Sequence, residues 1–350
     1  MRIGIVTVQD SNNFGSFLQG YALQHVLQEM GHEVVFLRTR SKRYLRRIFY
    51  HVIPRRREWL HLIKFLKNND TGRKKYCRFQ EELRVFQVME SYEPQKLDLV
   101  ILGSDEIWNA RTPVFRAPIF YGAGMSPVMT YAVSIGDADI QDMSCIDSSY
   151  FQRIAPVLVR DEHTAEFLRT QGIEAPVVCD PTLLVDKSVL CREYSNPLME
   201  KPFLLVYTYG LEPETVKSIR TFAVRRGLRI LSVCFSFPWC DGNLECTALE
   251  FCSVLEKAEY VFTSTFHGTI FSIVNHKQFV SLPKSRKTSD LLDSLELSSR
   301  LADAEALSAE SLEKKLDAEI DYTSVNEKIS YLRKTSLDLL EGGMNQVAVD

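Results

Sequence analysis

The chain alternates short apolar runs with amphipathic segments, and this order predicts strands and helices in turn. Residues 2–8 form an apolar run, residues 17–27 carry apolar side chains at helical spacing, and residues 32–38 form the next apolar run. Gly31 is a typical residue for the end of the helix between them. Strand, helix and strand at this spacing predict a βαβ unit with a parallel sheet and a right-handed crossover.

The same alternation continues through most of the chain. Further apolar runs predict strands at residues 97–104, 128–136, 155–161, 175–184, 203–210, 228–236, 260–263 and 278–283. Amphipathic segments lie between most of them, and the last, after Thr323 or Ser324, predicts a helix that stops at Gly342. The fold class is therefore α/β.

Length and one polar stretch predict two domains. A chain of 350 residues exceeds what one hydrophobic core usually serves. Residues 186–201 are polar and hold two prolines, so we interpret them as a linker. It divides an N-terminal Rossmann-like domain, 1–185 with a basic helical insertion at about 39–93, from a C-terminal Rossmann-like domain, 202–322. The last helix, 323–343, packs back on the N-terminal domain in this scheme.

Two doubly wound domains joined by a linker face each other across a cleft, which is the arrangement of GT-B glycosyltransferases. Ligands of such sheets bind beyond the carboxyl ends of the strands. The loops that follow strands are therefore the places to look for chemistry.

The insertion is strongly basic. Between Arg38 and Arg78 there are 15 Lys or Arg against two acids, a net charge of +13 in a chain whose total is −3. Residues 42–53 and 59–67 place apolar and cationic side chains on separate helical faces. Such helices either bind an anionic membrane surface or pack on the sheet with solvated basic faces. The segment matches no nucleic-acid reader motif, so we expect no nucleic-acid partner.

Several classes of protein are excluded by what the sequence lacks. There is no apolar run of transmembrane length and the N-terminus is strand-like rather than a signal peptide. The eight cysteines include no C-x-x-C pair, so we expect free thiols in a reducing cytoplasm, with the basic segment holding the protein at the inner membrane face. No G-x-G-x-x-G, Walker lysine motif, zinc motif or nucleophile elbow is present, and we expect no metal and no cofactor.

Residues 103–109, "GSDEIWN", follow an apolar run and offer groups suited to a sugar. Trp108 provides a stacking face, Asn109 an amide and Asp105 a carboxylate for hydroxyl groups. The alternative is a helix N-cap at Ser104 or Asp105, with Trp108 in the core.

Arg160 ends another predicted strand, directly before a predicted helix. A guanidinium beside a helix N-terminus suits a carboxylate or phosphate, because both the fork and the backbone amides point at the anion. The alternative is a surface ion pair with Asp161 or Glu162. Asp180 precedes Pro181 at the end of the next run, and we interpret it as a structural turn rather than a base.

His267 lies at a strand-to-helix turn that is rich in hydroxyl groups, in the stretch "TSTFHG". A histidine there can donate to phosphate or exchange protons near neutral pH, and the alternative is a buried histidine satisfied by a backbone carbonyl. The loop after the following strand adds three cations, Lys284, Arg286 and Lys287. Together these groups favour an anion site.

The ordered set of motifs resembles the polysaccharide pyruvyl transferase family. The stretches run from "RIGIVTVQDSNNFGSFLQGYALQHVLQEMGHEV" through "LDLVILGSDEIWN", "YAVSIG", "VRDEHTAEFLRTQGI", "CDPTLL" and "AEYVFTSTFHGTIFSIVNHKQFV" to "SDLLDSLEL". The resemblance spans Arg2 to about Leu340. The pair "GSDEIWN" and "TSTFHGTIFS" is its most specific part.

The resemblance implies a GT-B-like enzyme that moves the enolpyruvyl group of phosphoenolpyruvate onto a sugar of a surface polysaccharide or lipid-linked precursor, as a pyruvate ketal. Thr265 stands where many members carry Arg, as in a bacterial branch with sequences like T-D-S-F-H-G. The predicted roles fall into three groups: catalytic His267 and Asp105; donor-anion binding by Arg160, Lys284, Arg286, Lys287, Ser264 and Thr265; acceptor binding by Asn13, Trp108 and Asn109.

Two other functions stay open at this point. The first is a GT-B glycosyltransferase that uses a nucleotide sugar, which needs an acidic residue for the ribose. The second is a non-catalytic member of a polysaccharide assembly complex, held at the membrane by residues 38–78.

Overall fold

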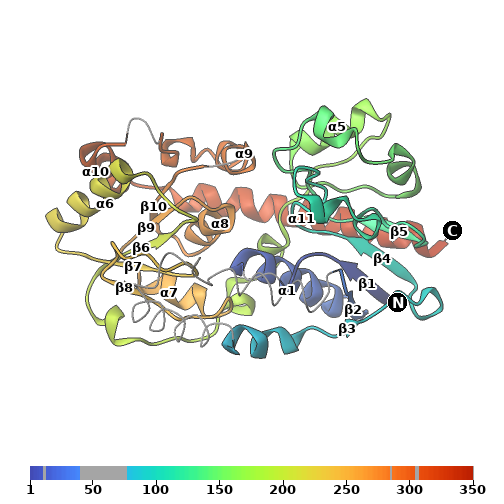
Figure 1. Cartoon of the computed structure of the whole chain (residues 1–350), viewed down its shortest axis with the longest axis horizontal. Helices are drawn as coiled ribbons and strands as arrows, with labels where there is room; N and C mark the ends of the chain where they lie inside the picture. The colour runs from blue at the N-terminus through green and yellow to red at the C-terminus, as the bar shows by residue number, and fades with distance from the viewer. Residues whose placement is uncertain (11–12, 40–76, 284–285, 304–306, 350) are drawn as a thin grey trace, which may run out of the picture.

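The computed structural model contains two parallel five-stranded sheets, each in a lobe of its own (Figure 1). It describes residues 1–10, 13–39, 77–283, 286–303 and 307–349. We call the part around the N-terminal sheet the first lobe and the part around the other sheet the second lobe. The predicted fold class, two Rossmann-like halves, is confirmed by this arrangement.

The sheet of the first lobe has the strand order β3-β2-β1-β4-β5. Its strands are β1 (Arg2–Val6), β2 (Glu33–Leu37), β3 (Val88–Met89), β4 (Leu99–Leu102) and β5 (Val128–Thr130). Residue Ile3 of β1 pairs with Val34 on one side and Leu99 on the other. The order reverses between β1 and β4, so the loops that follow these two strands diverge at the switch point, where such sheets bind ligands.

The sheet of the second lobe has the order β10-β9-β6-β7-β8. Its strands are β6 (Phe203–Tyr207), β7 (Arg229–Ser232), β8 (Gly242–Asn243), β9 (Tyr260–Thr263) and β10 (Gln278–Ser281). Here the order reverses between β6 and β9. The loops after these strands hold Thr208 and Ser264, whose hydroxyl oxygens lie 2.6 Å apart.

Helices cover the sheets and fill the space between the lobes. The longer ones are α1 (Phe14–Glu29), α5 (Glu162–Thr170), α6 (Pro213–Arg225), α7 (Phe251–Lys257), α8 (Phe266–Val274), α9 (Arg286–Ser294), α10 (Ala309–Asp317) and α11 (Tyr322–Val349). No helix among the described residues combines the length and the apolar character that a membrane crossing requires.

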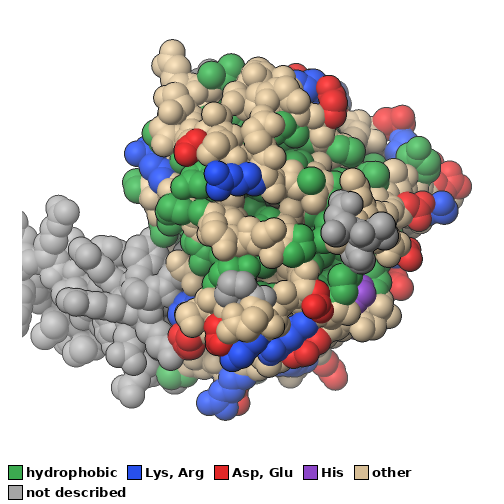
Figure 2. All heavy atoms as spheres, turned by 90° about the vertical axis from the view of Figure 1, so that its right-hand side faces the viewer, with side chains coloured by type: hydrophobic (Ala, Val, Ile, Leu, Met, Phe, Trp, Pro, Cys, Tyr) green, Lys and Arg blue, Asp and Glu red, His purple; other side chains and the backbone are tan. Residues whose placement is uncertain are grey.

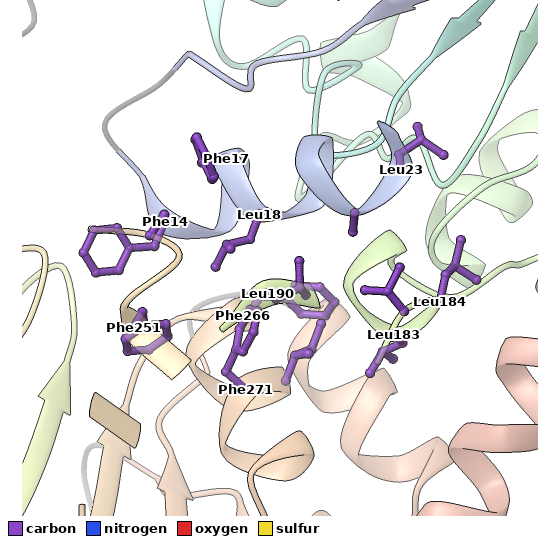
Figure 3. Packing of buried hydrophobic residues seen from close by; sticks show 14 of the residues in the cluster. Phe14, Phe17, Leu18, Leu23, Leu183, Leu184, Leu190, Phe251, Phe266 and Phe271 are labelled. Atoms are coloured by element: carbon purple, nitrogen blue, oxygen red, sulfur yellow. The ribbon is translucent and has the colours of Figure 1, made fainter. Parts of the chain in front are cut away.

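One hydrophobic cluster runs from the first lobe into the second. Helix α1 contributes Phe14 and Leu18 on the side that faces Phe251 and Phe271 of the second lobe, while Phe17 points to the opposite side, where its ring lies 5.0 Å from that of Phe86 (Figure 3). The rings of Phe14 and Phe251 lie 5.5 Å apart. Because α1 is almost entirely buried, its position is fixed by both lobes together.

Two of the predicted strands do not form in the structure. Residues 155–161 and 175–184 contribute only single parallel bridges, from Val159 to Val133 and to Val177. Each segment begins with an Ala-Pro pair, and proline has no N–H for a ladder. Both segments still extend the edge of the first sheet, so the residues after them stay beside its carboxyl end.

The last helix is longer than its sequence pattern indicates. It does not end at Gly342 but continues to Val349. Gly343 lies so close to the first lobe that a Cβ there would be 2.7 Å from the Pro156 side chain. Figure 1 shows α11 passing from the second lobe to the first. The predicted domain limits themselves stay a prediction.

The two predicted basic helices lie outside the described residues. Where the described residues resume, residues 77–82 are helical, and Arg78 donates two hydrogen bonds, 2.6 and 2.8 Å long, to the Glu250 carboxylate of the second lobe. On the face of the first lobe shown in Figure 2, the coloured Lys or Arg and Asp or Glu side chains are interspersed. The described part of that face therefore presents both signs of charge.

Candidate active site between the two lobes

Two basic side chains from separate loops, Arg160 and His267, meet at the Asp180 carboxylate. The Nη1 atom of Arg160 lies 3.3 Å from the Oδ2 atom of Asp180, and the Nε2 atom of His267 lies 3.4 Å from the same oxygen. Arg160 and Asp180 belong to the first lobe and His267 to the second. The guanidinium and the imidazole that the sequence predicts for one anion site are thus brought together.

Asp180 is held in place by the turn that it begins. Its Oδ1 accepts hydrogen bonds from the backbone N–H and the hydroxyl of Thr182, at 3.1 and 2.7 Å. Burial alone would raise the pKa of Asp180, but the neighbouring His267 and Arg160 outweigh burial and hold the pKa well below its usual range. Asp180 is therefore an anion that holds the two basic groups side by side.

Arg160 has more hydrogen-bonding capacity than this structure uses. Its residue is 7% exposed, and its Nε and Nη2 atoms have no hydrogen-bond partner among the described residues. Burial would lower the pKa of Arg160, but the carboxylates of Asp105 and Asp180 raise it, so the side chain stays charged. The predicted alternative, a surface pair with Asp161 or Glu162, is wrong because the guanidinium is buried among other groups.

The turn that carries His267 is built from hydroxyl groups and one obligatory glycine. Thr265 is the N-cap of α8, and its hydroxyl accepts from the N–H of Gly268 at 3.0 Å. A Cβ at Gly268 would lie 2.1 Å from the Thr263 hydroxyl oxygen, so only glycine fits there. Thr265 and Ser264 therefore support the turn, and both are buried.

His267 is packed against helix α1 of the other lobe. A Cβ at Gly15 would lie 1.9 Å from the imidazole Nδ1, so the absence of a side chain makes room for the ring. The Nε2 atom has no hydrogen-bond partner among the described residues, although Asp180 is near. The alternative prediction, a buried histidine that bonds a backbone carbonyl, therefore does not hold for the Nε2 atom of His267.

Asp105 lies near the same Nη1 atom of Arg160 as Asp180 does. Its carboxylate is 3.6 Å from the guanidinium and accepts a 2.8 Å hydrogen bond from the Ser16 hydroxyl. Burial would raise the pKa of Asp105, but Arg160 and Lys287 lower it further than burial raises it. The backbone of Asp105 has φ 87°, a region that costs energy for any residue except glycine and is typical of functional sites.

One of the three predicted loop cations reaches this cluster. The Lys287 ammonium pairs with the Glu106 carboxylate of the first lobe and lies 5.0 Å from the centre of the Phe266 ring. Arg286 is exposed at the start of α9, and Lys284 lies outside the described residues. The Arg160 guanidinium lies 5.0 Å from the same Phe266 ring, so the two cations share one aromatic side chain.

The three residues predicted to bind the acceptor lie in different surroundings. Trp108 is fully buried, and its indole N–H donates to the carbonyl of Phe120 at 2.8 Å. The prediction of a sugar-stacking Trp108 is therefore wrong, because neither face of the ring is available. Asn109 is nearly buried and donates to Glu106 at 3.2 Å, so it supports that carboxylate.

Asn13 joins the lobes. It is the N-cap of α1, and its amide N–H donates to the Tyr209 hydroxyl at 2.8 Å. The Tyr207 hydroxyl donates back to the Asn13 side-chain oxygen at 3.1 Å. A direct role of Asn13 in acceptor binding stays a prediction. In the structure Asn13 lies at the end of the loop between β1 and α1.

Some residues of the site were not found from the sequence. The sequence indicates only a turn at Asp180 and gives no role to Glu106, Gly15 or Tyr209. The signal that points to Asp180 is its position at the end of a predicted strand, at the same carboxyl edge of the sheet as Arg160. Tyr209 and Gly15 carry no local signal, because their importance arises from contacts between lobes.

One group of side chains among the described residues has the spacing of metal ligands. The ligand atoms of Cys191, Cys252 and Glu256 all lie within 4.8 Å of one another. Lys187 pairs with Glu256 at 2.7 Å, and burial raises the pKa of the Cys252 thiol to about 12. A metal needs thiolates. The group therefore fits a metal poorly.

Known structures with the same overall fold belong to the GT-B class. A candidate UDP-N-acetylglucosamine 2-epimerase from Listeria monocytogenes has a TM-score of 0.61 at 11% identity, covering 99% of this chain and 97% of its own. The S. aureus MnaA–UDP structure has a TM-score of 0.53 at 12% identity, covering 94% and 91%. The rhamnosyltransferase SpnG, complexed with thymidine diphosphate, has a TM-score of 0.50 at 12% identity, covering 98% and 99%. The fold is therefore GT-B.

The amino-acid sequence identifies the family. The model of the polysaccharide pyruvyl transferase family matches residues 13–285, and the chain belongs to this family of transferases. No curated protein matches the chain. The matched segment contains Asn13, Asp105, Arg160, Asp180 and His267, all of which contribute to the site between the lobes.

Proposed function

We propose that this transferase moves the enolpyruvyl group of phosphoenolpyruvate onto two hydroxyl groups of a sugar, in a surface polysaccharide or its lipid-linked precursor. The product is a cyclic pyruvate ketal, and phosphate is released. The family supports the transfer of pyruvate. The observation that carries the choice of donor is the Arg160 guanidinium, buried beside His267 with two nitrogen atoms that have no partner among the described residues.

A small dianion or trianion suits this arrangement. Its carboxylate or phosphate would accept from Nε and Nη2 of Arg160, which form one edge of the planar fork. Lys287 supplies a second positive charge from the other lobe, 5.0 Å above the ring that Arg160 also faces. The N-terminus of α8, where His267 lies, adds the partial positive charge of a helix end.

The reaction needs a group that exchanges protons, and His267 is the group placed to do so. In the proposed sequence, the CH2 carbon of the donor gains a proton and becomes a methyl group, which leaves positive charge on the neighbouring carbon. One sugar hydroxyl attacks that carbon. The second hydroxyl then displaces phosphate. The two hydroxyl protons end on the methyl group and on the phosphate, so no oxidant or cofactor is required.

Asp105 has a different role in this proposal. Because its pKa is lowered, it stays ionised and stabilises positive charge that develops on the donor carbon. It can also accept a hydrogen bond from an acceptor hydroxyl. A carboxylate with a lowered pKa is a weak base.

Access to the cluster requires contacts between the lobes to open. The side chains of Arg160 and His267 are 2% and 8% exposed. The Lys287–Glu106 pair and the hydrogen bond from Asn13 to Tyr209 join the lobes beside them. We therefore propose that the donor binds after these contacts separate and is enclosed when they re-form.

The test is phosphate release from labelled phosphoenolpyruvate in the presence of sugar acceptors. We expect His267→Ala to lower the rate by about 10²–10⁴-fold, the usual contribution of a general acid or base. His25→Ala is the matched control, because His25 lies in α1 and its ion-pair partner in the described part of the chain is Glu29, one turn along the same helix. Wild-type enzyme that leaves phosphoenolpyruvate intact with every acceptor, and consumes a nucleotide sugar instead, would refute the proposal.

Use of a nucleotide sugar is the competing proposal. It is favoured by the structures described as containing UDP and thymidine diphosphate, which share the fold at 12% identity. Only the shared fold supports the use of a nucleotide sugar. The same assay decides, because a nucleotide-sugar enzyme releases a nucleotide and no phosphate from phosphoenolpyruvate.

Membrane attachment through residues 38–78 is a separate proposal, supported by their charge of +13 and their amphipathic pattern. The full chain should sediment with vesicles that contain anionic lipid at low salt and be released at high salt. Failure to sediment at low salt would remove the proposal and would leave the proposed reaction untouched.

A further inference from the structure

Two cations lie close to the ring of Phe266, the first residue of α8. The centre of this ring is 5.0 Å from the guanidinium carbon of Arg160 and 5.0 Å from the ammonium nitrogen of Lys287. Phe266 and Lys287 belong to the second lobe, whereas Arg160 belongs to the first. The contact between Phe266 and Arg160 therefore joins the lobes, and it is lost when the lobes separate.

The ring attracts Arg160 in a different way from a carboxylate. The face of an aromatic ring carries partial negative charge and attracts a cation without a conventional hydrogen bond. A carboxylate oxygen accepts an N–H and so uses one of the donors of the guanidinium. A ring can thus stabilise a buried charge and leave its donors unused.

Arg160 shows this combination of burial and unused donors. Its side chain is 2% exposed, and its Nη1 atom donates to Asp180 at 3.3 Å. The Nε and Nη2 atoms have no hydrogen-bond partner in the part of the chain that the structure describes. The ring of Phe266 is therefore placed to stabilise the charge while these two nitrogen atoms stay available to a ligand.

A second pair of arginine and phenylalanine shows why burial matters. The guanidinium carbon of Arg226 lies 5.8 Å from the centre of the Phe222 ring, but the Arg226 side chain is 32% exposed and pairs with Glu313 and Asp317. Water and two carboxylates stabilise the charge of Arg226, so its ring adds little. In the buried surroundings of Arg160, the same kind of contact is worth up to about 30-fold in an equilibrium constant.

Phe266 also fills space in the hydrophobic cluster that both lobes share, and it is 8% exposed. A side chain that only fills space responds to changes in size and polarity. It does not respond to the charge of an arginine through the electron density of its ring. That electron density is therefore the property that separates the two roles.

We propose that Phe266 is a positioning residue: its ring attracts the guanidinium of Arg160, holds it against the second lobe when the lobes close, and leaves its unused N–H groups to the donor anion. This inference rests on the proposed function for the identity of that anion. A contact made only in the closed arrangement favours closure, and a donor that is enclosed there binds more tightly as a result.

The first experiment changes the electron density of the ring and nearly preserves its shape. Phenylalanines with one, two or three ring fluorine atoms replace Phe266 in the full chain, and phosphoenolpyruvate is titrated by calorimetry. Each fluorine draws electrons from the face of the ring and weakens its attraction for a cation. We expect the Kd to rise with each fluorine, by about 5- to 30-fold in total.

The same fluorine series at Phe222 is the matched control. Phe222 is buried in the second lobe and also faces an arginine, but that arginine is held at the surface by two carboxylates. The series at Phe222 should leave the Kd for phosphoenolpyruvate unchanged.

The second experiment needs no donor. Thermal unfolding of the Phe266 series is followed without phosphoenolpyruvate, both in wild type and in Arg160→Gln. We expect three fluorines to lower Tm by about 2 °C when Arg160 is present and by less when it is replaced. The effect of fluorine on the burial of the ring is common to both backgrounds, so the difference between them isolates the contact with Arg160.

Two results would overturn the inference. One is a Kd for phosphoenolpyruvate that stays constant along the series at Phe266, which would leave the proposed donor intact. The other is the same change in Tm with and without Arg160. If wild type binds no phosphoenolpyruvate, the proposed donor is wrong, and the Tm series alone then decides whether the ring holds Arg160.

Discussion

Among the described residues each lobe contains one buried arginine, and the two differ in how their donors are used. Arg300 of the second lobe is 1% exposed and donates to the carbonyls of Lys315, Ala318 and Glu319 and to the side chain of Gln278. Arg160 of the first lobe has one hydrogen bond, to Asp180, and two nitrogen atoms without partners among the described residues.

The difference separates a structural arginine from a binding arginine. Carbonyl oxygens satisfy both terminal nitrogens of Arg300 without placing a negative charge beside it, and only its Nε has no partner among the described residues. Burial lowers the pKa of Arg300. Asp105 and Asp180 keep Arg160 charged, but they occupy only part of its fork. A buried charge with unused donors is costly unless something completes it, and a small anion does so. The contrast predicts that the two arginines respond differently to mutation.

The largest effect is expected for Arg160→Lys. Lysine keeps the charge but cannot present two parallel donors, so the bound donor loses its orientation. We expect phosphate release to fall by about 10²–10³-fold, as when a preorganised donor is removed from other active sites. Tm should change little by comparison. A variant with wild-type turnover would show that the fork of Arg160 is not used.

Arg300→Ala should give the reverse result. It leaves the carbonyls of Lys315, Ala318 and Glu319, which accept in partly buried hydrogen bonds, without their donor, and each group that stays shielded from water costs about 1–3 kcal/mol. We expect the free energy of unfolding to fall by about 3 kcal/mol or more, measured by urea denaturation, while the folded fraction keeps its turnover. Arg226→Ala is the control, because Arg226 pairs with Glu313 and Asp317 at the surface and its loss should matter much less.

Gly15→Ala probes the contact that seats the imidazole. An alanine in a helix normally stabilises relative to glycine, by about 0.5–1 kcal/mol. At residue 15, however, the new Cβ would collide with His267 and displace it. A shift of about 1 Å can cost about 10²-fold in rate, and we expect a loss of that order. Gly342→Ala meets nothing within 4 Å, so it should stabilise and leave activity intact.

The smallest effect concerns the pH dependence of stability. The pKa of Asp105 is lowered in the folded protein, so its contribution is present above the unfolded value of about 3.9 and is lost as pH falls through the folded value. Asp105→Asn should therefore flatten the decline in the free energy of unfolding between pH 5 and pH 3. An unchanged slope would show that the carboxylate is not held by Arg160 and Lys287.

The fold and part of the site follow from the sequence because they depend on local patterns. Apolar runs placed the strands that carry Asp105 and His267, and the order of these runs predicted parallel sheets. The turn at Gly268 was recognisable from its residues alone. Proline explains the two segments that were predicted as strands but form single bridges, at Val159 and Val177.

The parts that the sequence does not reveal depend on tertiary contacts, some within a lobe and some between the lobes. Trp108 has the composition of a sugar-binding residue, yet its place depends on how the loop packs on Phe120. Asp180 looked like a turn because its partners, Arg160 and His267, are far away in the sequence. Gly15 accommodates an imidazole some 250 residues later, which no local pattern encodes.

The central claim is that the unused donors of Arg160 hold the donor substrate. Calorimetric titration of phosphoenolpyruvate into wild type, Arg160→Gln and Arg226→Gln tests it most directly. We predict that wild type and Arg226→Gln bind with the same affinity and that Arg160→Gln binds at least about tenfold more weakly, the loss of about one charge-assisted pair. Equal binding by all three proteins, or no binding by wild type, would contradict the claim.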